Sequence, residues 1–415
     1  MPGASDDAGF TLNGSTMKNL SFPRLSFQST GTLGAESCQS LLIALLRGLA
    51  ALQVALAHLR AETYPSLRGM SDAPIAYQLL AFSTGFAHQA VVVFFLISGW
   101  LVGGSLLNKW SQDQSLASYA IDRISRLWTV LIPTFLLMLV SASFMENIVA
   151  VPSVLDRTNE YSTLAFLGNL AGFQTISLPN FGRNYALWSL ANETWYYVLF
   201  PFLLLVFRCK AIWRKGASAL AIAGIASFLP ASILLYFSIW LLGAGCARVR
   251  IECGPITRLV LLLTCAALSV YFRLTGSNAD LVVDSYLQDL MCSLPLLALL
   301  ASMHRPMPTG SAAMRHLGTA THTLSEFSFT LYVTHVPAIA LLRYLGRTYL
   351  GRESFSPHHA VDYLMYFGAA SLLLAFAYLS YLAFESQTFR IRQFLKARLL
   401  SRAARRPTIT AAQIN

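Results

Sequence analysis

An arginine and a histidine share one stripe of the first apolar segment of the chain. Arg47 and His58 are eleven residues apart, which in a helix is about 20° past three full turns and about 16.5 Å along the axis. A guanidinium binds anions, and an imidazole can take a proton from a hydroxyl near neutral pH. The pair therefore predicts a long ligand lying along this helix. The alternative is that Arg47 snorkels to lipid headgroups and His58 bonds a neighbouring helix.

Two carboxylates accompany this pair. Glu62 lies four residues beyond His58 and would orient its imidazole if the helix continues that far; otherwise it is a solvated loop charge. Glu193 lies near the expected outer end of another apolar segment, beside Trp188 and Ser189. A carboxylate inside a membrane segment indicates a functional site by default, so Glu193, preceded by Ser189 and Asn192, predicts part of a polar cavity. The alternative for Trp188 is an interfacial anchor.

Further polar side chains border the apolar segments. Arg123 and Arg126 are three residues apart, share one face of a helix, and could bind two phosphate groups; positive-inside anchoring is the competing explanation. His335 is a candidate ligand-binding residue on its segment, or a bridge between helices. Three other histidines receive no role: His88, His358 and His359.

The composition of the chain excludes a water-soluble globular protein. Of its 415 residues, 55% are hydrophobic and 12% are charged, and the mean hydropathy is +0.54. The net charge of +11 could suit a nucleic-acid partner, but the basic residues cluster between apolar segments, so membrane topology explains them and no nucleic acid is expected. The six cysteines form no CxxC pair and no zinc spacing, so no metal site is expected.

Ten apolar segments predict an all-α, polytopic membrane protein with about ten transmembrane helices. A single helix over residues 216–250 would be about 52 Å long, too long for one crossing of a core about 30 Å thick, so we expect a short hairpin turning at Pro230. The ten segments cover residues 41–59, 82–107, 127–145, 186–207, 216–229, 231–247, 259–272, 286–303, 327–345 and 362–384.

The basic residues predict the orientation of these segments. With ten spans, 21 of the 30 Lys and Arg residues fall on the side of both termini and eight on the other side, with Arg47 inside a span. Because cytoplasmic loops hold the excess of Lys and Arg, both termini are expected in the cytoplasm. We expect a mobile tail over residues 1–38, a transmembrane domain over 39–388 and a basic tail over 389–415. Met17 is an alternative start.

Four motifs in order resemble the acyltransferase-3 family of bacterial integral-membrane acyltransferases. The first is Arg47-x10-His58; the second is the run from Val93 to Leu101, which reads Phe-Phe-x-x-Ser-Gly-aromatic-Leu and contains Ser98. The third and fourth are Arg123-x-x-Arg126 and Trp188-Ser189-Leu190-x-x-Glu193. Two weaker echoes are Leu331-Tyr332 with His335, and Phe384-Glu385. The family's usual acidic residue and glycine before Leu-Arg are Ala44 and Leu45 here.

The resemblance implies an enzyme of the bacterial inner membrane that takes an acyl group, often acetyl, from cytoplasmic acyl-CoA. The acceptor would be a hydroxyl of a polysaccharide, a glycolipid or another envelope molecule, with membrane lipids as further partners. Acyl-CoA would be a donor substrate, with no tightly bound cofactor. His58 would act as the general base, with Glu193 and Arg47 as further catalytic residues. Residues for the donor or acceptor would be Arg123, Arg126, Ser98, Trp188, Ser189 and His335.

Three other functions remain open from the sequence. A proton-coupled transporter also uses intramembrane His, Arg and Glu, although no inverted repeat is recognisable. A membrane acyltransferase of the Asn/His type is an alternative enzyme. An export-linked structural partner of polysaccharide synthesis would need none of these residues. The residues also leave open direct transfer or an acyl-histidine intermediate.

Overall fold

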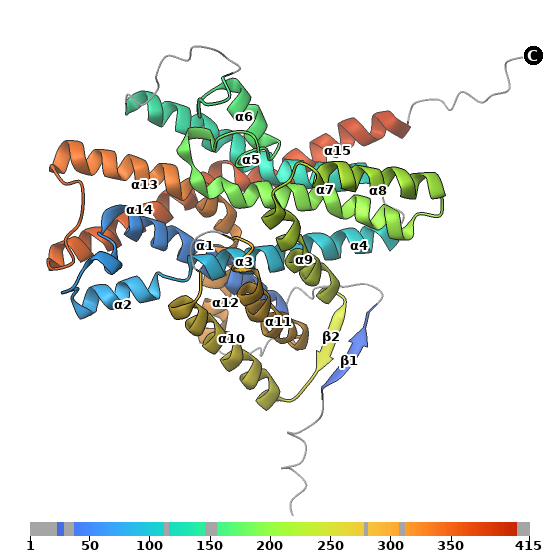
Figure 1. The fold of residues 1–415 in the computed structure, drawn as a ribbon, viewed down its shortest axis with the longest axis horizontal. Helices are drawn as coiled ribbons and strands as arrows, with labels where there is room; N and C mark the ends of the chain where they lie inside the picture. Colours follow the sequence, from blue (N-terminus) through green and yellow to red (C-terminus); the bar gives the residue numbers. More distant parts are fainter. Residues whose placement is uncertain are drawn as a thin grey trace, which may run out of the picture.

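The computed structural model describes residues 23–28, 37–111, 116–145, 156–277, 281–306 and 312–404, and these residues are mostly helical (Figure 1). The α-helices are α1 (Cys38–Thr63), α2 (Ile75–Ser83), α3 (Ala87–Ser98), α4 (Gly104–Ser111), α5 (Leu116–Phe144), α6 (Thr163–Leu170), α7 (Trp188–Arg208), α8 (Ile212–Ala226), α9 (Ala231–Cys246), α10 (Pro255–Thr275), α11 (Tyr286–Ser302), α12 (Ala312–Glu326), α13 (Ser328–Leu350), α14 (Ala360–Ala383) and α15 (Thr388–Ala404). Shorter turns are the π-helical η3 (Gly99–Gly103) and the 3-10 turns η2 (Leu67–Gly69), η4 (Phe181–Arg183), η5 (Tyr185–Leu187) and η6 (Glu385–Gln387). The strands are β1 (Arg24–Phe27) and β2 (Val249–Glu252).

The helical content and apolarity confirm an all-α, multi-pass membrane protein. Within the described residues, six helical segments are long and apolar enough to cross a membrane. Helices α9 and α11 are also apolar but shorter. The number of ten crossings stays a prediction.

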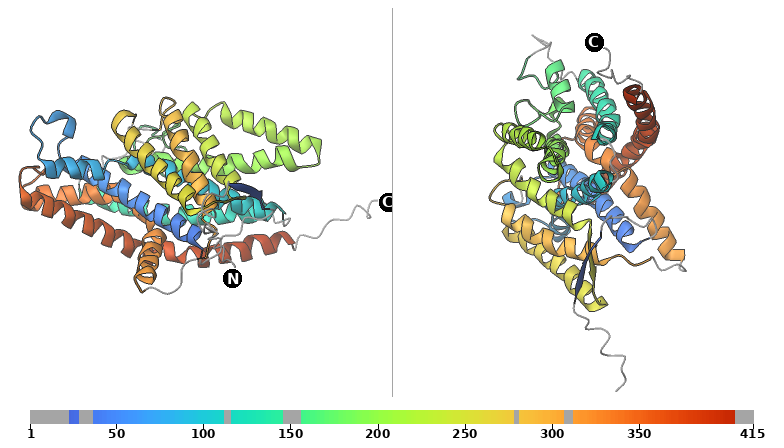
Figure 2. Two further views of the ribbon diagram at one scale, coloured as in Figure 1. Left: turned by 90° about the horizontal axis from the view of Figure 1, so that it is seen from below. Right: turned by 90° about the vertical axis from the view of Figure 1, so that its right-hand side faces the viewer.

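The break predicted at Pro230 is confirmed, but the two helices that flank it have different neighbours. Helix α8 ends at Ala226 and α9 begins at Ala231, with Pro230 at its N-cap. Helix α8 lies along α7, and Figure 2 shows the two running side by side. Helix α9 instead packs against α3 and η3. The proline therefore redirects the chain from one part of the bundle to another.

The ends of the chain carry structure within segments expected to be tails. Residues 24–27 form β1, which pairs antiparallel with β2 in the register Arg24 to Glu252. At the other end, α15 extends to Ala404 and packs along α5. Met17 and the remainder of the expected N-terminal tail lie outside the described residues.

Helix α1 is central to the bundle and carries Arg47 and His58. Its N-terminus is capped by the Ser37 hydroxyl, which accepts a hydrogen bond from the Ser40 amide at 3.1 Å. The helix packs against α3, α12 and α13. Gly48 allows α12 to approach, since a Cβ there would lie 2.8 Å from the Leu324 side chain. The stripe predicted on this helix therefore faces other helices.

Helix α3 continues through one π-helical stretch, η3, against which α9 packs closely. A Cβ on Gly99 would lie 2.0 Å from the Trp240 carbonyl oxygen, and one on Gly243 would lie 2.2 Å from the Leu96 carbonyl oxygen. Both contacts are with backbone, which cannot swing aside. The absence of side chains at these glycines thus sets the distance between α9 and the segment that carries Ser98.

We expect Gly243→Ala to destabilise the protein by about 1 to 3 kcal/mol, because the added methyl forces α9 away from α3. Thermal unfolding in detergent checks this. The matched control is Gly245→Ala on the same helix, where nothing lies within 4 Å of the added carbon. It should unfold at or slightly above the wild-type temperature, because alanine favours helix. Equal losses in the two variants would contradict the close-packing argument.

Candidate active site

A polar cavity of about 620 Å³ lies among helices α1, α3, α5, α7, α13 and α15. Its wall includes six of the nine candidate residues named above: Arg47, Ser98, Arg123, Arg126, Ser189 and Glu193. They come from four helices that are far apart in sequence. The structure therefore brings together most of the predicted site.

Glu193 is closer to the arginines than the sequence indicated. We expected it near the outer end of its segment and the Arg123–Arg126 pair at the inner face. Helix α7 begins at Trp188, so Glu193 does lie near that end, in the second turn, yet it lines the same cavity as both arginines. Hydropathy locates a span but not the depth at which its inward side chains meet those of other helices.

The Glu193 carboxylate is held by hydroxyl groups. Ser98 and Tyr197 each donate a short hydrogen bond to Glu193 Oε1. The indole of Trp240 in turn donates to Ser98 Oγ at 3.1 Å. Since Ser98 directly precedes η3, the close α9 contact described above also fixes this serine. The carboxylate is thereby oriented by two helices besides its own.

The two arginines of the Arg-x-x-Arg motif have different surroundings. Arg126 Nη1 forms an ion pair at 2.5 Å with Glu385 Oε1, whose side chain is fully buried, and its guanidinium lies over the Phe329 ring. Arg123 instead lies 5.8 Å from the ring centroids of both Tyr119 and Tyr197. The motif therefore presents two unequal guanidinium groups rather than a symmetric pair.

Arg47 lies on the wall of the cavity at one end of the α1 stripe. Its Nη2 donates to Ser328 Oγ at 3.4 Å. Arg126, Glu385 and Glu193 line the same cavity as Arg47. Arg47 is therefore part of a mixed charge cluster inside the bundle and not a headgroup anchor at the lipid surface.

His58, at the other end of the stripe, contacts His335. His58 Nδ1 lies 2.8 Å from His335 Nε2, with the rings stacked at 5.0 Å, and the Tyr185 ring stands edge-on to His58 at 5.1 Å. His335 is almost completely buried. His335 thus links α13 to α1, which is the alternative given for it above, and its partner is the candidate base; a part in ligand binding stays a prediction.

The hydrogen bonds of the histidine pair assign their neutral tautomers. His335 Nδ1 lies 3.2 Å from the Leu331 carbonyl oxygen, which can only accept, so this nitrogen carries the proton. His335 Nε2 is then an acceptor, and His58 Nδ1 must donate to it. The remaining nitrogen of the first histidine, His58 Nε2, consequently carries a lone pair that can take a proton.

A tyrosine and a serine connect the histidine pair to the cavity. Tyr332 and Ser189 both line the cavity, and their hydroxyls lie 2.7 Å apart. The Tyr332 ring is 5.8 Å from that of His335. The other three candidate residues, His58, His335 and Trp188, are not among the described residues that line the cavity. Trp188 begins α7 and packs against the apolar core.

Glu62 does not orient the catalytic candidate. Its carboxylate pairs with Arg343, while the nearby histidine nitrogen His58 Nδ1 contacts His335. Helix α1 runs to Thr63, so Glu62 is a helical residue and not a loop charge, and its partner is Arg343 on α13 rather than the histidine four residues earlier. Salt bridges between helices compete successfully with local ones here because α1 and α13 pack along one another.

Several residues of the site were not assigned roles from the sequence. From the sequence, Glu385 was only part of a weak match to a family motif, Phe384-Glu385, yet it pairs with Arg126. Tyr197, four residues after Glu193, was predictable from helical spacing alone. Arg392 lines the cavity but resembles the other basic residues of the C-terminal segment.

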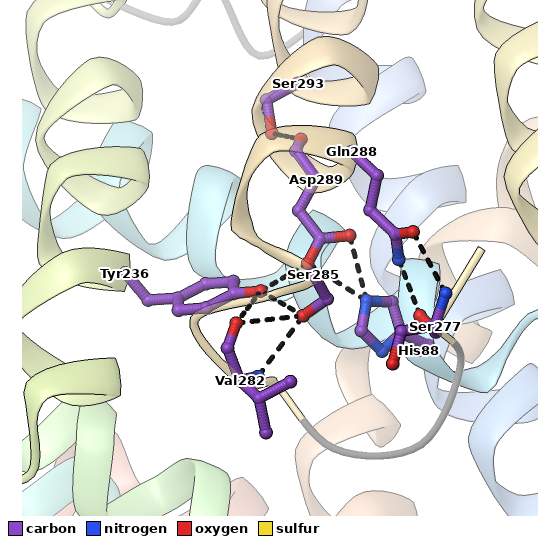
Figure 3. A network of polar contacts seen from close by, with 8 residues as sticks. All are labelled: His88, Tyr236, Ser277, Val282, Ser285, Gln288, Asp289 and Ser293. Carbon is purple, nitrogen blue, oxygen red and sulfur yellow. Dashed lines mark hydrogen bonds and ion pairs between the residues drawn. The ribbon is translucent and has the colours of Figure 1, made fainter.

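A second polar cluster joins α3, α9 and α11 (Figure 3). His88 Nε2 lies 2.8 and 3.0 Å from the two oxygens of Asp289, which also accepts from the Tyr236 hydroxyl. Ser285 Oγ lies 2.7 Å from that hydroxyl. His88, given no role from the sequence, is thus a buried connection among the helices that support the Ser98 side of the cavity.

Comparisons with known proteins agree with the membrane acyltransferase resemblance. Peptidoglycan O-acetyltransferase OatA of Listeria monocytogenes is 29% identical over 158 residues, which are 34% of this chain and 24% of that protein. An uncharacterised protein of Haemophilus influenzae is 28% identical over 122 residues, which are 28% of this chain and 48% of that protein. The chain therefore covers less than half of the length of either relative. No solved structure matches it.

The family model covers nearly the whole helical part of the chain. It is described as an acyltransferase domain and matches residues 42–385, from the first turns of α1 to the buried carboxylate of η6. The matched region contains all nine candidate site residues. The chain therefore belongs to the acyltransferase-3 family.

Proposed function

We propose that the protein is an O-acyltransferase of the bacterial inner membrane that moves an acyl group, acetyl in the simplest case, from cytoplasmic acyl-CoA to a hydroxyl of an envelope polysaccharide, glycolipid or similar acceptor. The observation that carries this proposal is the single cavity lined by Arg47, Arg123, Arg126 and Glu193. Guanidinium groups suit the phosphates of the donor. Similarity to a peptidoglycan O-acetyltransferase supports a hydroxyl acceptor in the envelope.

The topology of the proposal follows from the positive-inside rule. Ten crossings with both termini in the cytoplasm put the basic helix α15 and the first turns of α5 at the cytoplasmic face. The donor then enters at the arginine end of the cavity. Its pantetheine arm spans the axial distance of about 16.5 Å between Arg47 and His58.

In the proposed reaction, His58 Nε2 takes the proton of the acceptor hydroxyl as its oxygen attacks the thioester carbonyl carbon. The carbon–sulfur bond breaks, the ester forms, and the proton passes from His58 to the departing CoA thiolate. His335 is a positioning residue, since its contact with His58 Nδ1 fixes the tautomer that leaves Nε2 as the base. Glu193 orients the acceptor from within the cavity, and Tyr332 lies between the cavity and His335.

The proposal is tested with purified protein in liposomes, labelled acetyl-CoA and an envelope extract. We expect release of free CoA together with transfer of the label to the extract. In a deletion strain, envelope glycans or lipids should lack the mass of the acyl group, as measured by mass spectrometry. Label that stays on CoA, with an unchanged envelope, would refute an acyltransferase of this kind. Flux of a solute in the same liposomes without acyl donor would instead indicate the transporter.

A further inference from the structure

The arginines that line the cavity differ in what they contact. Four arginines line the cavity: Arg47, Arg123, Arg126 and Arg392. Four carboxylates line it as well: Asp122, Glu193, Glu326 and Glu385. Each carboxylate in the wall attracts nearby cations. Which arginines remain available to a ligand therefore depends on where the carboxylates are engaged.

The carboxylates are engaged by groups other than Arg123 and Arg392. Asp122 pairs with Lys109 and, at 2.6 Å, with Lys396. Glu385 pairs with Arg126, and Glu193 accepts from the two hydroxyls described above. At the rim, Glu326 lies 3.3 Å from His322 Nδ1 and accepts from the Tyr381 hydroxyl.

Arg123 and Arg392 are left with donors that no protein acceptor meets. The Nε of each is buried and has no hydrogen-bond partner among the described residues. Their closest recorded contacts are with aromatic rings, Tyr119 and Tyr197 for Arg123, and Phe389 for Arg392 at 5.7 Å. A buried guanidinium donor without an acceptor is costly unless a ligand supplies one.

One ion pair places these two arginines at the same end of the cavity. Lys396, one helical turn after Arg392 on α15, pairs with Asp122, which directly precedes Arg123 on α5. The two helices pack along one another, as Figure 1 also shows. The clamp between Lys396 and Asp122 thereby fixes the position of Arg392 relative to Arg123.

We propose that Arg123 and Arg392 together hold the phosphates of the acyl donor, a thioester of a phosphorylated nucleoside diphosphate, while Arg126 serves mainly as the partner of Glu385. This inference rests on the proposed function. Guanidinium groups with unused, fork-shaped donors match phosphate oxygens, and two such groups suit a ligand with several phosphates. Arg392 lies beyond the family-matched residues 42–385, so the C-terminal helix completes the donor site.

The same chemistry could come from an anionic lipid headgroup. An apolar cavity of about 400 Å³ shares Arg123, Leu127 and Tyr197 with the polar one and is rimmed by exposed Ile124 and Trp128. A lipid tail in it would bring its phosphate to Arg123. The polar cavity, where Arg392 lies, favours the nucleotide, and the experiment distinguishes the two sources.

The test measures CoA binding by calorimetry in nanodiscs of neutral lipid. We expect Arg392→Gln to weaken CoA binding by about tenfold or more, as loss of a charged hydrogen bond does. The KM for acetyl-CoA should rise with kcat little changed, and Arg392→Lys should be intermediate. The matched control is Arg390→Gln, which removes the same charge from an exposed position on the same helix and should bind CoA like the wild type.

Each outcome decides between the inference and the function on which it rests. Wild-type protein that binds CoA, with Arg392→Gln binding it equally well, would overturn the role of Arg392 and leave the proposed function intact. Wild-type protein that binds no CoA would overturn both. If Arg392→Gln loses only stabilisation by added anionic lipid, with its CoA affinity unchanged, the site holds a headgroup and the inference is wrong. Thermal unfolding of each variant verifies that it is folded.

Discussion

Replacing His58 by alanine is expected to lower the rate of acyl transfer by about 10² to 10⁴-fold, the usual contribution of a general base. The reason is geometric: the contacts of His335 with His58 and Leu331 leave His58 Nε2 as the nitrogen that can take a proton. In the proposed binding mode the donor phosphates contact arginines at the other end of the α1 stripe, so the KM for acetyl-CoA should change little. Release of CoA in the presence of acceptor measures both parameters.

The matched control for this variant is His359→Ala, which removes an imidazole from an exposed position at the start of α14. It should transfer acyl groups at the wild-type rate. A folded His58→Ala protein that also keeps that rate would show that the histidine pair is structural. The chemistry would then have to be sought beside Glu193, inside the cavity.

The largest effect on stability is expected from Arg126→Gln. Glu385 is fully buried and would lose its ion-pair partner, keeping only the Thr330 amide, at 3.1 Å, and hydroxyl as donors. Removing one partner of a buried pair costs about 3 to 5 kcal/mol. Because a third of the Arg126 side chain is exposed and Thr330 still bonds the carboxylate, we expect the lower end of that range. Thermal unfolding in detergent measures it.

Arg123→Gln is the comparison for this prediction, one turn earlier on the same helix. Its guanidinium contacts aromatic rings and pairs with no carboxylate among the described residues, so the loss should be about 1 kcal/mol. For CoA affinity we expect the opposite order: Arg123→Gln should weaken CoA binding more than Arg126→Gln does. If the two variants lose equal stability, the Arg126–Glu385 pair does not have the structural role assigned to it.

Local spacing predicted the parts of the site that lie on one helix. The separation of eleven positions places Arg47 and His58 on one face of α1, where Arg47 lines the cavity and His58 contacts His335. The proline at 230 separates two helices as predicted. Periodicity and helix-breaking chemistry act over a few turns, so they can be read from neighbouring residues.

Long-range partners could not be predicted in the same way. His58 and His335 are 277 residues apart, and Arg126 and Glu385, which form an ion pair, are 259 residues apart (385 − 126). Which faces of distant helices meet depends on packing details such as Gly99 and Gly243, which fix the approach of α9. For the same reason, the sequence placed Glu193 apart from the arginines with which it shares a cavity.

The most direct measurement is a structure of the protein with a non-hydrolysable acetyl-CoA analogue. We expect the phosphates against Arg123 and Arg392, and the carbonyl carbon near His58 Nε2, with room for an acceptor oxygen about 3 to 3.5 Å from that carbon. An analogue bound elsewhere, or one whose carbonyl carbon is separated from His58 by the Tyr332 side chain, would contradict the proposed mechanism.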